Sequence, residues 1–148
     1  MPDTVATPRL VEVRRTIHAP RQRVFDAWTK AEEIKAWHAP GPMTVSRADI
    51  DLRPGGAYRI HMVAPTGEEH RVVGTYREVD PPRRVVYTWQ WETGIDQTVT
   101  TVSLDFIERG ADTEVVLRHE GFSRDEARAS HEQGWTAIMD KLAAHFAS

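Results

Sequence analysis

The chain has 148 residues, a length typical of one domain with a substantial hydrophobic core, and we expect a single domain over 1–148. Its 19 basic and 22 acidic side chains give a net charge of −3, which argues against a nucleic-acid-binding module, because such modules usually carry a basic excess. The chain contains no cysteine, which excludes disulfides, thiolate metal sites and cysteine nucleophiles.

The first nine residues are polar, include two prolines and are expected to form a loose lead-in. They lack the basic segment and apolar run of a signal peptide. No apolar run in the chain approaches the ~20 residues that a bilayer-spanning helix needs. These features predict a cytoplasmic protein with no membrane span.

A strand and two short helices are predicted next. Leu10–His18 is rich in β-branched residues and partly alternating, which favours a strand. Pro20 is well placed just before the start of a helix, and Arg21–Thr29 then shows apolar residues at helical spacing. Lys30–Trp37 reads as a second short helix, which must end before the proline-rich run 38–42.

Six further strands are predicted, separated by short turns rich in glycine, proline and aspartate. Short turns imply antiparallel neighbours, because parallel strands need a long crossover. The pairing of the third of these strands is uncertain, because a bulge is possible near Gly74. The predicted strands are Met43–Leu52, Ala57–Val63, Glu69–Val79, Val85–Glu92, Thr98–Glu108 and Thr113–Glu120.

The last segment, Ser123–Phe146, predicts a long amphipathic helix, and the sheet is its natural partner. Its apolar stripe includes a histidine, a glycine and a tryptophan where a plain core would carry leucines, so we interpret it as a helix that closes over a cavity. The stripe consists of Ala127, His131, Gly134, Trp135, Ile138, Leu142 and Phe146.

Aromatic and histidine side chains are the candidates for function. The chain has five tryptophans, which fit either a core built from large side chains or an aromatic-lined pocket for a flat or greasy molecule. By periodicity His119 and His131 both face inward. Each is either a hydrogen-bonded core residue or a donor to a ligand, and no third side chain at a metal-binding spacing accompanies them. We expect no metal and no cofactor.

Motifs of common enzyme classes are absent from the sequence: there is no nucleophile elbow, phosphate-binding loop or dinucleotide glycine fingerprint. The adjacent carboxylates Glu32-Glu33 and Glu68-Glu69 read as solvated charge. No catalytic set is identified, and an enzyme is the less favoured interpretation.

The chain resembles the START-like (Bet v-like) superfamily with the helix-grip fold, and more narrowly the small bacterial proteins homologous to the activator of the ninety-kilodalton heat-shock protein ATPase. The likeness rests on the order in which its motifs appear, since no single motif is specific. It implies an α+β fold in which a curved seven-stranded antiparallel sheet surrounds the C-terminal helix, with two short helices after the first strand and a cavity between sheet and helix. Four stretches carry it: 18–40, 51–62, 74–92 and 117–146.

The resemblance also implies which side chains line that cavity as a ligand-binding site. It gives no catalytic set and no metal site. The expected lining residues are Trp37, Tyr58, Ile60, Met62, Tyr76, Trp89, Trp91, Phe106, His119, His131, Trp135 and Ile138.

Three functions follow as hypotheses. The first is a protein that binds a small hydrophobic or aromatic ligand. The second is an enzyme of the polyketide cyclase or dehydratase kind, in which a histidine acts as acid or base. The third is a module that binds the heat-shock chaperone ATPase. Nucleic acid is not an expected partner, and a homodimer remains open.

Overall fold

A computed structural model describes residues 9–92, 94 and 96–147 of the chain. Most of the predicted lead-in therefore lies outside the described residues. The elements follow the predicted order, with ends that differ by a few residues. They are β1 (Leu10–Ile17), α1 (Arg21–Thr29), α2 (Ala31–Trp37), β2 (Thr44–Ile50), β3 (Ala57–Val63), β4 (Glu69–Asp80), β5 (Arg84–Trp91), β6 (Thr100–Arg109), β7 (Asp112–Glu120) and α3 (Asp125–His145).

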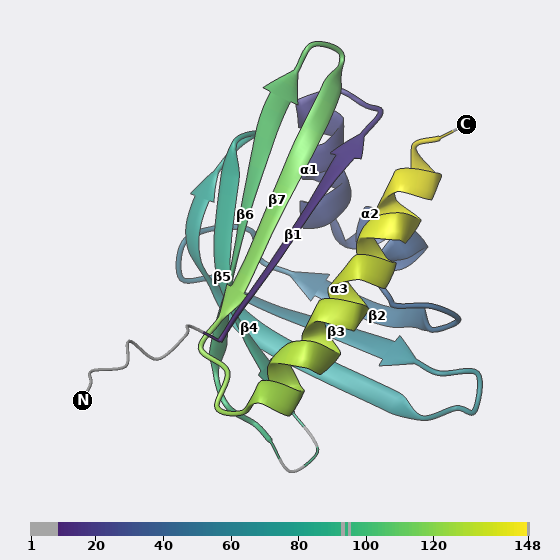
Figure 1. Ribbon diagram of the computed structural model, residues 1–148, viewed down its shortest axis with the longest axis vertical. Coiled ribbons are helices and arrows are strands. Elements are labelled where there is room, and N and C mark those ends of the chain that lie inside the picture. Colours follow the sequence, from purple (N-terminus) through teal and green to yellow (C-terminus); the bar gives the residue numbers. More distant parts are fainter. Residues whose placement is uncertain (1–8, 93, 95, 148) are drawn as a thin grey trace.

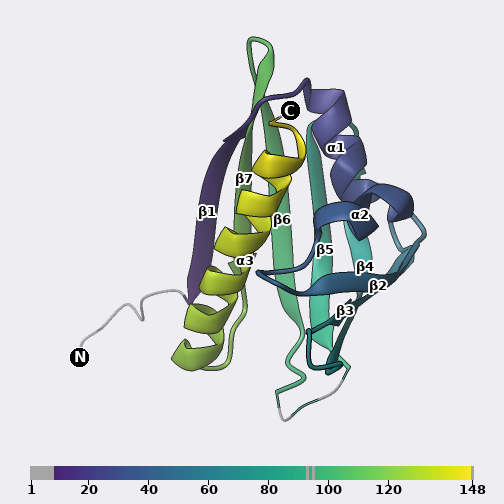
Figure 2. The same ribbon diagram turned by 90° about the vertical axis from the view of Figure 1, so that its right-hand side faces the viewer.

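The strands form one seven-stranded sheet in the order β1-β7-β6-β5-β4-β3-β2, and every neighbouring pair is antiparallel. The α+β helix-grip prediction is confirmed. The sheet curves around α3, while α1 and α2 link β1 at one edge to β2 at the other (Figures 1 and 2). No helix in the described part of the chain is long and apolar enough to cross a membrane.

The sheet is irregular in two places, and neither is at Gly74. Register shifts occur in β2 between Val45 and Arg47, and in β4 between Tyr76 and Glu78. The possible bulge near Gly74 is thus displaced along β4.

Gly74 has a different role, which depends on its missing side chain. It lies opposite Tyr58 in the regular β3–β4 pairing. The Tyr58 hydroxyl donates a hydrogen bond of 2.5 Å to the carbonyl of Thr88 on β5. A Cβ at Gly74 would collide with that carbonyl oxygen and lie 2.5 Å from Tyr58 Cε2. Glycine is therefore required for Tyr58 to reach across β4 to β5.

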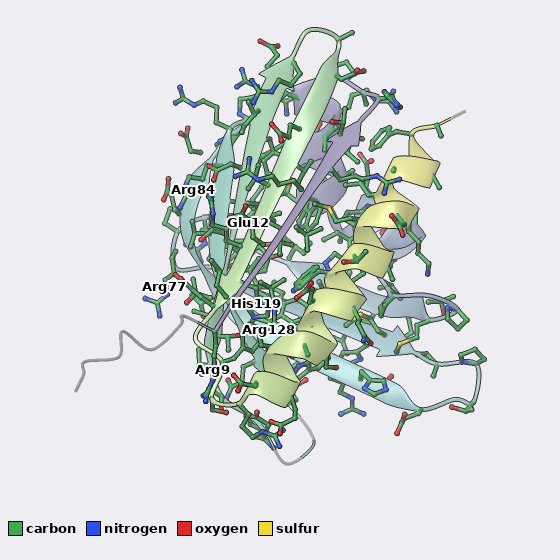
Figure 3. The ribbon with its side chains drawn as sticks, viewed as in Figure 1. Arg9, Glu12, Arg77, Arg84, His119 and Arg128 are labelled. Carbon is green, nitrogen blue, oxygen red and sulfur yellow. The ribbon has the colours of Figure 1, made fainter. Side chains whose placement is uncertain are left out.

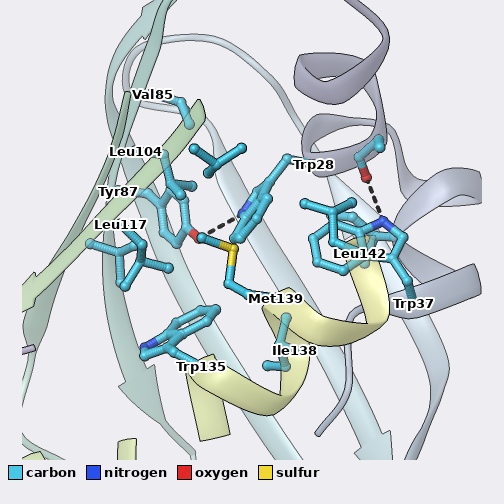
Figure 4. Close-up of a cluster of buried hydrophobic side chains, with 14 of the residues drawn as sticks. Trp28, Trp37, Val85, Tyr87, Leu104, Leu117, Trp135, Ile138, Met139 and Leu142 are labelled. Atoms are coloured by element: carbon cyan, nitrogen blue, oxygen red, sulfur yellow. Dashed lines mark hydrogen bonds between the residues drawn. The ribbon is translucent and has the colours of Figure 1, made fainter. Parts of the chain in front are cut away.

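The core lies between the concave face of the sheet and the helices. Trp28 on α1 donates its indole N–H to the Tyr87 hydroxyl at 3.1 Å, and Trp37 on α2 donates to the Ala27 carbonyl at 3.1 Å (Figure 4). These bonds satisfy polar atoms that would be costly to bury alone. From α3 the core receives a fully buried set at helical spacing: Trp135, Ile138, Met139 and Leu142.

The N-terminal half of α3 differs from the rest of the helix. Ala127, His131 and Gly134 belong to the predicted apolar stripe, yet they are only half-buried. The C-terminal half of α3 therefore packs into the core, whereas its N-terminal half borders an incompletely filled space.

The other face of the sheet carries charge. Arg84 on β5 contacts Asp105 on β6 at 2.9 Å, and Arg118 on β7 contacts Glu12 on β1 at 3.0 Å. Figure 3 shows Arg84 and Arg77 on the side of the sheet away from α3. Solvent-exposed pairs of this kind contribute little to stability, about 0–1 kcal/mol each. They identify this face as solvated, in agreement with the strand alternation.

Candidate functional site

A cavity of about 350 Å³ lies between the middle of α3, residues 130–138, and the strands β3, β4 and β5. The loop after α2 and the loop after β5 complete its wall. Its size suits a small organic molecule. The lining residues are Pro40, Met43, Met62, His70, Trp89, Trp91, Gly94, Asp96, Ser130, His131, Gly134, Trp135 and Ile138.

Three indoles from two elements dominate this wall. Trp89 and Trp91 share one face of β5, and their ring centroids are 5.5 Å apart at an angle of 86°. Trp135 on α3 meets Trp89 with centroids 4.8 Å apart. The strand period of two places the first pair together, and helix packing adds the third ring. The result is an aromatic corner where sheet and helix meet.

His119 is tied into a chain of hydrogen bonds behind this corner. The indole N–H of Trp135 donates to Nδ1 of His119 at 2.8 Å, so the imidazole proton is on Nε2. Nε2 then donates to the Thr100 hydroxyl at 2.6 Å, and that hydroxyl donates to the Trp89 carbonyl at 3.0 Å. Burial, with a smaller contribution from His131, lowers the pKa of His119 to about 2, so it is neutral at physiological pH.

His131 has a similar arrangement at the cavity wall. Its Nδ1 lies 2.7 Å from the Ala127 carbonyl and donates to it, while its Nε2 accepts the indole N–H of Trp91 at 3.0 Å. Burial lowers the pKa of His131, which favours the neutral ring that this pattern requires. Both histidines converge as the sequence suggested, with ring centroids 5.1 Å apart.

The convergence does not produce an acid–base pair. All four ring nitrogens of His119 and His131 already have partners, so neither ring offers a nitrogen to a substrate proton. General acid–base catalysis needs such a nitrogen within reach of the reacting group. The pair therefore acts to fix the indoles of Trp91 and Trp135 in place.

His38 is a third inward histidine, which the sequence did not single out. It is fully buried, and neither ring nitrogen has a hydrogen-bond partner among the described residues. Its ring meets those of Trp28 and Trp135 nearly edge-on, at 88° and 86°. N–H···π contacts of this geometry compensate only partly for a missing hydrogen bond. Burial lowers the pKa of His38 to about 4, so this ring is neutral as well.

Of the expected lining residues, half border the cavity and half do not. Trp37, Ile60, Phe106 and His119 are buried away from it, and Tyr58 and Tyr76 pack against Tyr87. Those that border it are Met62, Trp89, Trp91, His131, Trp135 and Ile138.

Other lining residues were missed by sequence reasoning. His70 had a usable signal, because it shares a face of β4 with buried Val72. Ser130 is on the exposed side of the predicted stripe, and no periodicity applies to the loop residues Pro40, Met43 and Asp96. The positions of these loop residues are set by the tertiary structure, which brings both loops to the cavity wall.

A second, smaller cavity of about 240 Å³ adjoins the first. Trp89, Trp91, Asp96, Ser130 and His131 line both. The smaller one continues towards the start of α3, where Phe122, Ser123, Arg124, Glu126 and Ala127 line it. His131 and its indole partner therefore stand at the boundary between two chambers.

A wider groove lies on the solvated face of β2–β5. Exposed Asp49 and Arg59 line it, and Arg59 contacts Glu92 at 3.5 Å. Asp49 lies directly opposite Arg59 in the β2–β3 pairing, and its carboxylate contacts Arg47 at 2.6 Å. This groove lies open to solvent on the outer face of the sheet, so it does not enclose a ligand in the way the inner cavity does.

An antiparallel sheet curved around a C-terminal helix, with an aromatic cavity between them, defines a START-like protein of the helix-grip class. The chain belongs to the family described as Activator of Hsp90 ATPase homolog 1-like protein, which matches residues 18–147.

Known relatives agree with this assignment. The activator of 90 kDa heat shock protein ATPase homolog 1 of Homo sapiens is 23% identical over 126 residues, which cover 84% of this chain and 33% of the human protein. The chain thus spans about a third of the length of that relative.

Solved structures also share the fold. The AHSA1 protein of Silicibacter pomeroyi is 26% identical, with a TM-score of 0.83 over 93% of this chain and 97% of that one. A protein of Chromobacterium violaceum is 23% identical, with a TM-score of 0.87 over 95% of this chain and 98% of that one. At such identity the second likeness concerns the fold alone.

Proposed function

We propose that this protein binds a small hydrophobic or aromatic molecule in the cavity between the sheet and α3. One observation carries the proposal: the 350 Å³ cavity is walled by the indoles of Trp89, Trp91 and Trp135, whereas the C-terminal half of α3 packs into the buried core. Hydrogen bonds to His131 and His119 hold two of these rings in place without a ligand. A pre-organised wall lowers the entropic cost of binding.

Gly134 provides a sharp test of this site. It lines the cavity from α3, and a Cβ built on it meets nothing within 4 Å. Gly134→Leu should therefore project a branched side chain into the cavity and obstruct it, while Gly134→Ala adds a single methyl group and should leave room for a ligand. Both substitutions also remove a helix-interior glycine, so neither is expected to unfold α3.

The experiment is a thermal-shift screen of the wild type against fatty acids, flavonoids, aromatic polyketides and sterols. A ligand at a hundredfold its Kd stabilises the folded state by about 2.7 kcal/mol, roughly 5–10 °C for a domain of this size. We expect the shift to persist in Gly134→Ala and to vanish in Gly134→Leu. A ligand that binds Gly134→Leu as tightly as the wild type would place its site elsewhere and refute the proposal.

A second candidate is a chaperone-binding module, which the family description and the human relative favour. The matching region is only a third of that relative, so the activity named for the relative comes to this chain as a proposal. Stimulation of the ATPase of a purified ninety-kilodalton heat-shock protein by the full chain would support it. Unchanged ATPase together with no detectable complex would refute it.

The cyclase or dehydratase hypothesis has less support. It requires a histidine with a free nitrogen at the cavity. His131 and His119 use both of theirs within the fold, which leaves His70, whose Nε2 lies 3.1 Å from the Glu68 carboxylate.

A further inference from the structure

The wall of the 350 Å³ cavity is electron-rich and carries no positive side chain. Among its described lining residues there is neither a lysine nor an arginine. It contains the three indoles, the thioethers of Met43 and Met62, and the carboxylate of Asp96. An aromatic ring is negative on its face, and a thioether is soft and polarizable. The wall thus suits a positive group better than a negative one.

Two of the three indole N–H groups of this wall are already donated within the fold. Trp91 donates to His131 at 3.0 Å and Trp135 donates to His119 at 2.8 Å. The remaining indole nitrogen, Nε1 of Trp89, has no hydrogen-bond partner among the described residues, but it is buried beyond the reach of solvent. An anionic oxygen in the cavity would therefore find no indole donor, and donation to histidine leaves more electron density on the two rings.

The imidazoles offer little to an anion either. His131 is neutral and uses its one N–H on the Ala127 carbonyl. His70, near the opening, has its Nε2 3.1 Å from the Glu68 carboxylate. Glu68 thus occupies one ring nitrogen of His70 and adds negative charge beside the opening.

Asp96 makes the charge of the wall negative. Hydrogen bonds from Thr98, with further contributions from Ser123 and Arg124, lower the pKa of this carboxyl, which is therefore ionised at neutral pH. Arg124 lies 3.5 Å from the carboxylate, but it lines the smaller cavity and its side chain is half-exposed. Arg124 therefore compensates part of the Asp96 charge, from the side of the smaller cavity.

We propose that the ligand of this cavity carries a cationic head, of the alkylammonium or quaternary ammonium class, held against the indoles of Trp89, Trp91 and Trp135 with Asp96 nearby. This proposal rests on the proposed function and narrows its ligand class. Aromatic rings bind such cations through their quadrupole, and a tryptophan face is the strongest side-chain partner. The arrangement disfavours a carboxylate or sulfonate of the same size.

Three probes of matched shape separate charge from hydrophobicity: phenyltrimethylammonium, the neutral isostere tert-butylbenzene, and the anion benzenesulfonate. Affinities are measured by ligand-observed NMR titration at low salt. We expect the cation to bind at least about tenfold more tightly than the neutral probe, equivalent to about 1.4 kcal/mol, and the anion to bind most weakly. Gly134→Leu should abolish binding of the cation.

Two substitutions test which side chains cause the preference for the cation over the neutral probe. Asp96→Asn should weaken the cation several-fold and leave the neutral probe nearly unchanged. Its matched control is Asp140→Asn, which removes the same charge from the outer face of α3, where Asp140 pairs with Arg15 at 2.6 Å. Trp91→Leu keeps an apolar wall but removes a π face, so it should reduce binding of the cation more than that of the neutral probe.

The outcomes separate this proposal from the one it rests on. If tert-butylbenzene or benzenesulfonate binds as well as the cation, and Gly134→Leu blocks it, the cavity is a binding site and the cationic preference is wrong. The preference is also wrong if no probe binds while another ligand of the thermal-shift screen does. If nothing binds in either experiment, both proposals fail.

Discussion

The indole N–H of Trp91 donates to Nε2 of His131, and the two heavy atoms are 3.0 Å apart. This bond joins β5 to α3 at the boundary of the two chambers. It also fixes the tautomer of His131, whose Nδ1 is bound to the Ala127 carbonyl. The ring is therefore a partition as well as a support for the indole.

Removing the partition should widen the range of ligands. His131→Ala is expected to join the chambers of 350 and 240 Å³, so that longer ligands bind more tightly than in the wild type. Affinities for a homologous ligand series of increasing length, measured by calorimetry, test this expectation. His131→Gln retains much of the bulk and is the control. An unchanged optimum length in His131→Ala would show that the ring does not separate the chambers.

His38→Phe should stabilise the protein, because it replaces a buried ring with two unpartnered nitrogens by an apolar ring of similar shape. An unsatisfied buried polar group costs about 1–3 kcal/mol. We expect the variant to have a higher free energy of unfolding at pH 7, measured by urea denaturation. A lower value would mean that the surrounding indoles, those of Trp28, Trp37, Trp89 and Trp135, require the imidazole.

The stability difference between His38→Phe and the wild type should depend on pH. The folded-state pKa of His38 is about 4, below its ordinary value of 6.5, so the unfolded chain binds a proton more readily. The free energy of unfolding of the wild type is therefore independent of His38 protonation above about pH 6.5. It decreases as the pH falls towards 4, by about 3 kcal/mol in all. His38→Phe should lack this loss, so the stability difference should grow as the pH falls. A constant difference from pH 7 to pH 4 would contradict this assignment.

The chain of bonds from Trp135 through His119 to Thr100 should be cooperative. His119→Leu leaves the Trp135 indole N–H without its buried acceptor and is expected to cost about 2–4 kcal/mol of stability. Thr100→Val should lower the free energy of unfolding by less, since it removes only the last group of this hydrogen-bonded chain. In a double-mutant cycle measured by urea unfolding, the two effects should be clearly less than additive. Strict additivity would mean that the groups act independently.

Two glycines should respond oppositely to alanine. Gly74→Ala forces a methyl group into the Thr88 carbonyl and the Tyr58 ring, and we expect a loss of about 1–3 kcal/mol. Gly134→Ala places its methyl group in the open cavity and should gain up to about 1 kcal/mol from helix propensity. Thermal unfolding of the two variants compares them directly. Destabilisation by both would indicate that the space beside Gly134 is smaller than described.

The sequence predicted the sheet and the direction of its side chains because alternation has a period of two and buried faces are apolar. It therefore placed Trp89 and Trp91 on the inner face correctly. It could not tell which inner residues border a cavity, since Ile60 and Met62 have the same pattern but only Met62 lines it. That difference depends on depth along the strand and on what the helix covers.

Loops and bulges were the other source of error. His38 belongs to the proline-rich run 38–42, for which the sequence predicted only that the helix ends before it, and its full burial follows from tertiary packing. Asp96 borders the cavity from the loop after β5, and no local pattern in the sequence indicates that position. The bulge expected near Gly74 was assigned from the glycine itself, whereas the register shift occurs beyond Tyr76.

The pairing of β1 with β7 has a consequence for how the chain folds. Leu10 lies opposite Glu120, so the first strand has its only sheet neighbour near the other end of the described sequence. During synthesis, β1 would leave the ribosome early and would remain unpaired until β7 had also been synthesised. Such a long loop closure slows folding. During that interval the edge of β1 is exposed to other chains, and assistance from cellular folding factors would matter most then.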